Sequence, residues 1–345
     1  MGEDIEQRST ARVRFPGISP RAYEHPVDRG ALAVLRAVPG IGPVLQAVAG
    51  AFTERGERLV YLASSIRVGP KQYPRLDRLR LETAATLDVD PVPELFVRRD
   101  PVPNAVTLGI DKPFIVLTTG LVDLLDQDGL RFAIGHEMGH VLSGHALYRT
   151  ILQRLMQVQY GLGWMPVGYW AIRAVIAALG EWYRKTELTC DRAGLLCVQD
   201  PAAGLRAHVA MAGGMDLSEV DTAEFLNQAR EYDRVEDVRD SVLKLIRTWP
   251  LTHPLAVVRA AELQRWAASG EYRAILTGEY PRREDDRPTS TFTEDIKAAA
   301  RSYKESAAQS EDPLMKVFNE LGGVVAGAAD KVRSKFGGNQ AEQSS

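Results

Sequence analysis

Cysteine is scarce in this sequence, with only Cys190 and Cys197 among 345 residues. Seven residues of helix would hold these two side chains about 10 Å apart, which is too far for a disulfide. Neither cysteine belongs to a Cys-x-x-Cys pair, so the sequence predicts no structural zinc knuckle. The small cysteine count weakly favours a reducing compartment.

An excess of charge of one sign is also lacking. The formal net charge is −3, and 25% of the residues are charged. A nucleic-acid-binding protein usually carries a basic patch, so we expect no nucleic-acid partner. The apolar fraction of 45% is ordinary for a soluble globular protein. A chain of this length can bury the core of one large domain or of two ordinary ones.

Long uninterrupted hydrophobic runs are missing as well. Residues 1–14 are polar and show no features of a secretory signal. The apolar stretch 31–52 is broken by prolines and glycines, which predicts two short helices with a structural or a membrane-surface role. Residues 155–172 carry no charge but contain glycines and a proline, and Arg173 follows them. We therefore favour a buried or interfacial helical hairpin over a membrane span, with membrane contact through 155–183 left open.

The order of patterns along the chain predicts a mostly helical protein with a small sheet. We interpret residues 1–25 as a flexible N-terminal arm, 26–280 as the main domain, and 281–345 as a linker with an amphipathic, partly disordered C-terminal tail. The tail is a second candidate for peripheral membrane contact. We expect a cytoplasmic location, with membrane association left open.

The expected elements before and around the central motif are the following. Helices are predicted within 28–90, at 121–125, at 130–155 behind an Asp126 cap, and at 181–197; strands are predicted at 94–98 and 114–119, with Asn104-Ala105 in a loop between them.

The sequence His136-Glu137-Met138-Gly139-His140 is the feature that carries chemistry. Two histidines at positions i and i+4 of a helix lie on one face and can share a zinc ion, which also needs a third protein ligand and an open position for catalysis. Glu137 can then act on a metal-activated water as general base and later as proton donor. Gly139 lets another element approach the helix closely.

The third ligand has to come from elsewhere in the chain. His145 follows His140 by five residues, so in a continuous helix it would point away from the two ligands. Glu187 and Asp191 are a better source, because they are also i and i+4 on an expected helix. One of the two carboxylates can bind the metal while the other orients a ligand histidine.

These segments resemble a known family. The runs Phe132 to His140 and Glu187-x-x-x-Asp191-Arg192-x-Gly194 look like the HtpX and CAAX prenyl protease (type 1) family of gluzincin metallopeptidases. Asn104-Ala105, followed by the strand 114–119, is similar to the family's substrate-binding edge strand. Thr252-His253-Pro254 with Arg259 is similar to its C-terminal His-Pro element. The resemblance covers roughly residues 61–266.

The resemblance implies an α+β, predominantly helical zincin-like domain with a small edge sheet and one Zn²⁺ per chain. The implied zinc ligands are His136, His140 and Glu187, with Glu137 as base and acid. The implied supporting roles fall to Asp191 beside a ligand, Arg259 near the site, His253 at the oxyanion, and Asn104 with Ala105 along the substrate backbone.

The leading hypothesis is an endopeptidase that cleaves extended or unfolded polypeptides held along an edge strand. One alternative is a protein-binding or chaperone-like module with a residual zinc site, although an intact Glu137 argues against it. Another is metal-dependent hydrolysis of a non-peptide amide.

Overall fold

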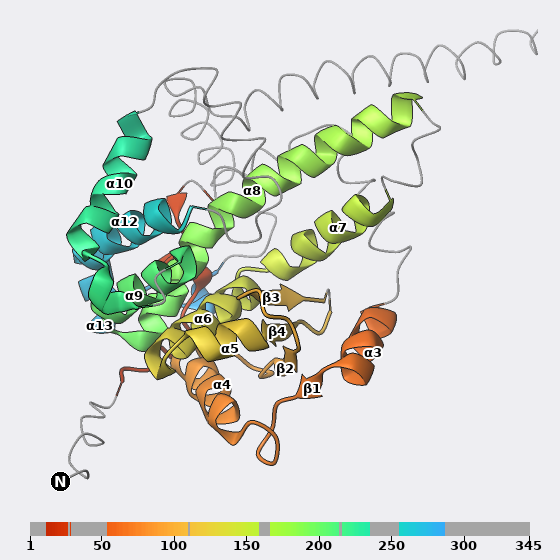
Figure 1. Ribbon diagram of the computed structural model, residues 1–345. Helices are drawn as coiled ribbons and strands as arrows, with labels where there is room; N and C mark the ends of the chain where they lie inside the picture. The colour runs from red at the N-terminus through yellow and green to blue at the C-terminus, as the bar shows by residue number, and fades with distance from the viewer. Residues whose placement is uncertain are drawn as a thin grey trace, which may run out of the picture.

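The computed structural model describes residues 12–26, 28, 54–109, 111–158, 166–213, 216–234 and 255–286. Helices predominate in these residues, and one small mixed sheet accompanies them, which confirms the predicted fold class (Figure 1). The strands are β1 (Ile66–Arg67), β2 (Glu94–Arg98), β3 (Ala105–Leu108) and β4 (Phe114–Thr118). The α-helices are α3 (Glu54–Ser64), α4 (Pro74–Leu87), α5 (Thr119–Leu124), α6 (Gln127–Leu142), α7 (His145–Val158), α8 (Pro166–Val198), α9 (Pro201–Ala212), α10 (Thr222–Arg234), α12 (Ala256–Ala267) and α13 (Gly270–Leu276).

The sheet has the strand order β1-β2-β4-β3. β2 and β4 pair in parallel, whereas β1 and β3 are antiparallel to their neighbours. All five residues of β4 are buried, and this strand has a neighbour on each side. The expected edge strand at 114–119 is therefore an inner strand, and this expectation was wrong. The segment Ala105–Leu108, whose first residue we expected in a loop, forms the end strand instead.

Helix α6 carries the central motif and begins at Gln127, three residues before the predicted start at Leu130, with Asp126 as the predicted cap. The Asp126 side chain accepts a hydrogen bond from the backbone N–H of Gly129 at 2.7 Å, as an N-cap should. The single helix expected over 130–155 is wrong, however, because α6 ends at Leu142 and α7 starts at His145. Gly144 separates the two with φ +69°, a left-handed conformation that glycine adopts at little cost.

Helix α8 is longer than the expected helix at 181–197, because it begins at Pro166. α7 and α8 lie side by side, so the described parts of 155–183 form two packed helices (Figure 1). Within the part of the chain that the structure describes, no helix has both the length and the apolar character needed to cross a membrane.

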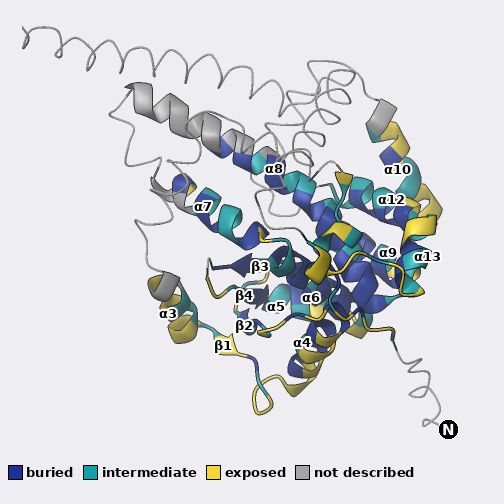
Figure 2. Cartoon of the chain, turned by 180° about the vertical axis from the view of Figure 1, so that it is seen from behind, coloured by how far each residue is buried: buried dark blue, intermediate teal, exposed yellow. Residues whose placement is uncertain are grey.

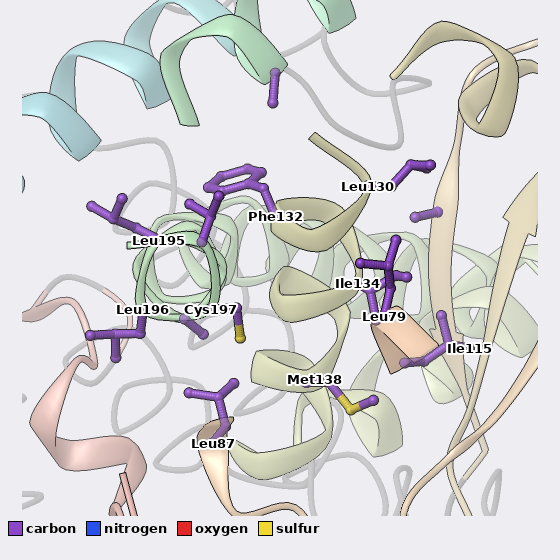
Figure 3. Close-up of a cluster of buried hydrophobic side chains, with 14 of the residues drawn as sticks. Leu79, Leu87, Ile115, Leu130, Phe132, Ile134, Met138, Leu195, Leu196 and Cys197 are labelled. Atoms are coloured by element: carbon purple, nitrogen blue, oxygen red, sulfur yellow. The ribbon is translucent and has the colours of Figure 1, made fainter. Parts of the chain in front are cut away.

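The core lies where α6 and α8 meet α4 and the sheet. Figure 3 shows Ile134 and Met138 of α6 beside Leu79 and Ile115, while Cys197 and Leu196 approach from α8. Figure 2 shows the same pattern for the residues whose burial is described, which are buried mostly on α6, on the second half of α8 and in the sheet.

The N-terminal segment 12–26 is part of this core. Phe15, Ile18 and Tyr23 are fully buried in it. The backbone N–H of Ser19 donates to the carbonyl of Pro281 at 3.0 Å, which also ties down the start of the predicted linker. The expectation of a flexible arm over 1–25 is thus wrong for residues 12–25, because their aromatic and aliphatic side chains have a core to enter.

Several expectations concern residues outside the described ranges. These are residues 1–11, the two short helices at 31–52, the loop with His253, and the tail after 286. The domain boundaries at 26 and 280 stay predictions.

Candidate metal centre

Helix α6 places both motif histidines and Glu137 in the interior. The Nε2 atoms of His136 and His140 are 3.2 Å apart, so both face one point. His136 is 4% exposed and His140 1%, while Glu137 is fully buried. Burial lowers the pKa of His140 to about 4 and outweighs the opposite effects of Glu187 and Glu137. The ring is therefore neutral near pH 7, which is the form that binds a metal ion.

Helices α6 and α8 cross closely, which brings Glu187 and Asp191 of α8 to the two histidines. A Cβ atom at position 139 would lie 2.7 Å from the Cβ of Ala193, and one at position 135 would lie 2.7 Å from Cys197. Both positions are glycine, so the two helices pack more closely than larger residues would allow. The expected role of Gly139 as a point of close approach is confirmed.

Glu187 lies on the face of α8 that meets the histidines. Its Oε2 is 3.6 Å from Nε2 of His136, and its Oε1 is 3.4 Å from Nε2 of His140. The guanidinium of Arg259 on α12 lies 2.9 Å from Oε2 and compensates the buried charge. The structure thus brings together the three residues expected to bind the metal.

Asp191 lies one turn further along α8 and contacts the other nitrogen of His136. Its Oδ1 is 3.0 Å from Nδ1 of His136. Arg259 donates to both carboxylate oxygens of Asp191, at 2.6 and 2.8 Å. Although burial acts in the opposite direction, this guanidinium holds the pKa of Asp191 well below its usual range. His208 on α9 completes the cluster, with Nε2 3.3 Å from Oδ2 of Asp191.

Glu137 faces the end strand of the sheet. The hydroxyl of Thr107 on β3 donates to Oε2 of Glu137 at 2.7 Å, which fixes the orientation of the carboxylate. Ala105, also on β3, lines a cavity together with His136 and Glu137. The remaining lining residues are Leu121, Leu125, Phe132, Ala133, Ala207, His208, Met211, Ala256 and Arg259.

Asn104 precedes this strand and is anchored to β4 by its backbone. Its N–H donates to the hydroxyl of Thr118 at 2.8 Å, and its carbonyl accepts from the N–H of Thr118 at 3.0 Å. Asn104 therefore lies directly before the first residue of the end strand β3.

A cysteine and a tyrosine of α8 also lie near the histidines. The thiol of Cys190 is within 4.8 Å of ring nitrogens of His136 and His140, which makes it a competing candidate ligand. Burial raises the pKa of this thiol well above its usual value and so disfavours the thiolate form that binds metals. The hydroxyl of Tyr183 lies 3.3 Å from Nε2 of His140, and the two rings stack.

Sequence reasoning missed Thr107, His208, Tyr183 and the true position of His145. His145 starts α7 and brings its Nδ1 to 3.2 Å from Nδ1 of His140, because the chain turns at Gly144. Gly144 was the one available signal for this break. Tyr183 lies on α8 four residues before Glu187, so the same helical spacing could have indicated it. Thr107 and His208 approach from β3 and α9, and their spacing from the motif carries no pattern.

Comparisons with known proteins agree with this geometry. The model of Peptidase family M48 matches residues 70–267. The plastoglobule-localized metallopeptidase 48 of Arabidopsis thaliana is 34% identical over 274 residues, which cover 78% of this chain and 79% of that protein.

Shorter matches join the chain to bacterial proteases. A protease HtpX homolog of Tropheryma whipplei is 32% identical over 99 residues, or 28% of this chain and 34% of that protein. One from Levilactobacillus brevis is 37% identical over 82 residues, or 23% of this chain and 27% of that protein. No solved structure matches. From the family model and the extended match to a metallopeptidase, the chain belongs to Peptidase family M48 and is a metal-dependent protease.

Proposed function

We propose that this chain is a zinc endopeptidase that hydrolyses peptide bonds of extended or unfolded polypeptides. The observation that carries the proposal is the convergence of three donor groups on one point. His136 and His140 are 3.2 Å apart at Nε2, and the Glu187 oxygens lie 3.6 and 3.4 Å from these nitrogens. We take these three residues as the metal ligands.

The spacing of the donors fits zinc. In a tetrahedral site with bonds of about 2.0–2.1 Å, neighbouring ligand atoms are roughly 3.3 Å apart. The Nε2–Nε2 distance of 3.2 Å is close to this value, and so are the distances of 3.6 and 3.4 Å from one Glu187 oxygen to His136 and from the other to His140. Two neutral imidazoles and a carboxylate also form a common ligand set of catalytic zinc sites, which leave the fourth position to water or substrate.

A bound zinc ion would act as a Lewis acid, lowering the pKa of a water molecule and polarising the substrate carbonyl. In our proposal Glu137 takes the proton from the attacking water and later gives it to the leaving nitrogen. Thr107 holds the Glu137 carboxylate in place for both transfers. We assign oxyanion stabilisation to His253, which lies outside the described residues, and we propose that Arg259 and Asp191 support the ligands.

Two features support our proposal that the substrate chain is bound in extended form. β3 ends the sheet, and Ala105 lines the same cavity as His136 and Glu137. A peptide added along β3 would therefore pass Glu137, with Asn104 at the start of the strand as a further backbone contact. Leu121, Phe132 and Met211 make the cavity apolar, which favours an apolar substrate side chain next to the cleaved bond.

Location and membrane contact stay proposals. The Arabidopsis thaliana relative is named for plastoglobules, and peripheral membrane contact of this chain through 155–183 or the tail is our proposal. The expected cytoplasmic location has no support from the comparisons.

The test is Glu137→Gln, with zinc content and cleavage of casein measured on the same preparations. We expect zinc to be retained and cleavage to fall by at least about 100-fold, because the amide cannot accept a proton. Cleavage at the wild-type rate would overturn the proposal. A wild-type chain that binds unfolded casein without cleaving it would instead support the alternative of a binding module with a residual zinc site.

A further inference from the structure

A second buried cluster lies on the side of His140 that faces away from His136. Nδ1 of His140 is 3.2 Å from Nδ1 of His145, and Nε2 of His145 is 3.2 Å from Oδ2 of Asp28. Asp28 is fully buried and His145 is 2% exposed. The carboxylate of Asp28 is thus connected to His140 through the imidazole of His145.

Asp28 is held firmly by helix α8. The indole N–H of Trp182 donates to its Oδ1 at 3.1 Å, and the hydroxyl of Thr189 donates to its Oδ2 at 2.7 Å. Burial opposes ionisation, but His145 and Thr189 keep the pKa of Asp28 below its usual value. The backbone N–H of His25 donates to the same Thr189 hydroxyl at 3.0 Å, which fixes the chain next to Asp28.

The hydrogen bonds have only one consistent direction when Nε2 of His140 faces a metal ion. Nδ1 of His140 then carries the proton and donates to Nδ1 of His145. His145 in turn carries its proton on Nε2 and donates to Asp28, because an ionised carboxylate only accepts. The thiol of Cys190, 3.6 Å from the same Nδ1 of His145, is a weak donor and fits this direction too.

We propose that Asp28 and His145 are positioning residues that orient His140 for metal binding. The N-terminal segment is then part of the metal site and not only of the core. The inference rests on the proposed function, because it takes His140 to be a metal ligand. Neighbours of this kind fix the tautomer and the ring orientation of a ligand histidine, and their loss commonly weakens metal binding about 10–100-fold.

The first experiment measures the zinc dissociation constant of the full chain by competition with a chromophoric chelator. We expect Asp28→Asn to weaken zinc binding about 10–100-fold, because the neutral amide is a weaker acceptor for the Nε2–H of His145 than the carboxylate is. Asp77→Asn is the matched control, since Asp77 is also buried and paired, with Arg80 at 2.7 Å, but lies on α4 away from the site. It should bind zinc like the wild type. Unchanged affinity in Asp28→Asn would overturn the proposal.

The second experiment separates positioning from packing at His145. His145→Phe keeps the ring shape but offers no acceptor to His140, whereas His145→Asn is smaller and keeps an oxygen near the Nδ1 position. We call the hydrogen-bonded chain from His140 through His145 to Asp28 the relay. A positioning role for this relay predicts that the Asn variant binds zinc more tightly than the Phe variant. It also predicts that the absorption spectrum of the cobalt-substituted Asn variant is closer to that of the cobalt-substituted wild type. A packing role predicts the reverse order, which would contradict us. This pair also decides the question if Asp28→Asn fails to fold.

The wild type distinguishes failure of this inference from failure of the proposed function. If the wild type binds no zinc, and His136→Gln has the same zinc content as the wild type, the metal assignment itself is wrong. If the wild type binds one zinc ion and the relay variants match it, only the relay is wrong.

Discussion

At its Nδ1 atom His136 contacts a carboxylate directly, whereas Nδ1 of His140 is linked to one through a second histidine. Asp191 supports His136 at 3.0 Å and is itself held by Arg259 and His208 from helices α12 and α9. On the side of His140, the partner is His145 and the carboxylate comes from the N-terminal segment. The two histidines are therefore held by residues from different parts of the chain, and α8 contributes residues to both supports.

The difference shows how one helix can serve both sides. Glu187 and Asp191 lie on the side of α8 that faces His136, while Trp182 and Thr189 face Asp28. Positions that differ by two residues are about 200° apart around a helix, so Thr189 cannot share the face of Glu187 or Asp191. Motion of α8 would disturb both histidines at once.

The largest expected effect comes from breaking the support of His136. Arg259→Gln leaves the carboxylates of Asp191 and Glu187 buried without their guanidinium. We expect the free energy of unfolding to fall by about 3–5 kcal/mol, measured by urea denaturation of the metal-free protein.

Arg265→Gln is the control for this variant, because Arg265 lies on the same helix but is exposed and pairs with Glu262 at the surface. Arg265→Gln should lower the free energy of unfolding by less than about 1 kcal/mol. Equal losses in the two variants would show that the buried pair is not what stabilises this side.

The sequence predicts the two sides of the site unequally, for a physical reason. Glu187 and Asp191 share one helix at a spacing of four, so periodicity alone places them together. His145 and Asp28 lie across a helix break and a long stretch of chain, and no periodic pattern connects such positions. The same limit applies to the sheet, where the pattern predicts β2 and β4 but pairing with β3 decides which strand is at the end.

The stability of the protein at acid pH should depend on His140. Its pKa is about 4 in the folded protein and about 6.5 when exposed. The unfolded chain therefore binds a proton between these values while the folded chain does not, and stability falls as the pH drops from 6.5 to 4. For His140 the loss is on the order of 3 kcal/mol in the metal-free protein.

His140→Gln should flatten this pH dependence in denaturation curves recorded at several pH values. Part of the pH dependence should remain because of His25, since burial lowers its pKa to about 4 as well. A slope unchanged by the substitution would mean that His140 is not the buried neutral base assumed here.

The smallest effect is expected at Thr107, which belongs to neither support. Thr107→Val removes the hydrogen bond to Glu137 and keeps the side-chain shape, so kcat should fall on the order of tenfold with zinc content unchanged. Thr107→Ser keeps the hydroxyl and should stay near the wild-type kcat. Loss of zinc in Thr107→Val would show that Thr107 acts on the ligands and not on the base.

The identity of the third ligand is tested most directly by X-ray absorption at the zinc edge of the loaded wild-type chain. Glu187 and Cys190 lie one turn apart on α8, and both approach the histidines. With His136, His140 and Glu187 on the metal, the spectrum should show only nitrogen and oxygen neighbours, at about 2.0–2.1 Å. A sulfur neighbour at about 2.3 Å would place Cys190 on the metal and contradict the assignment.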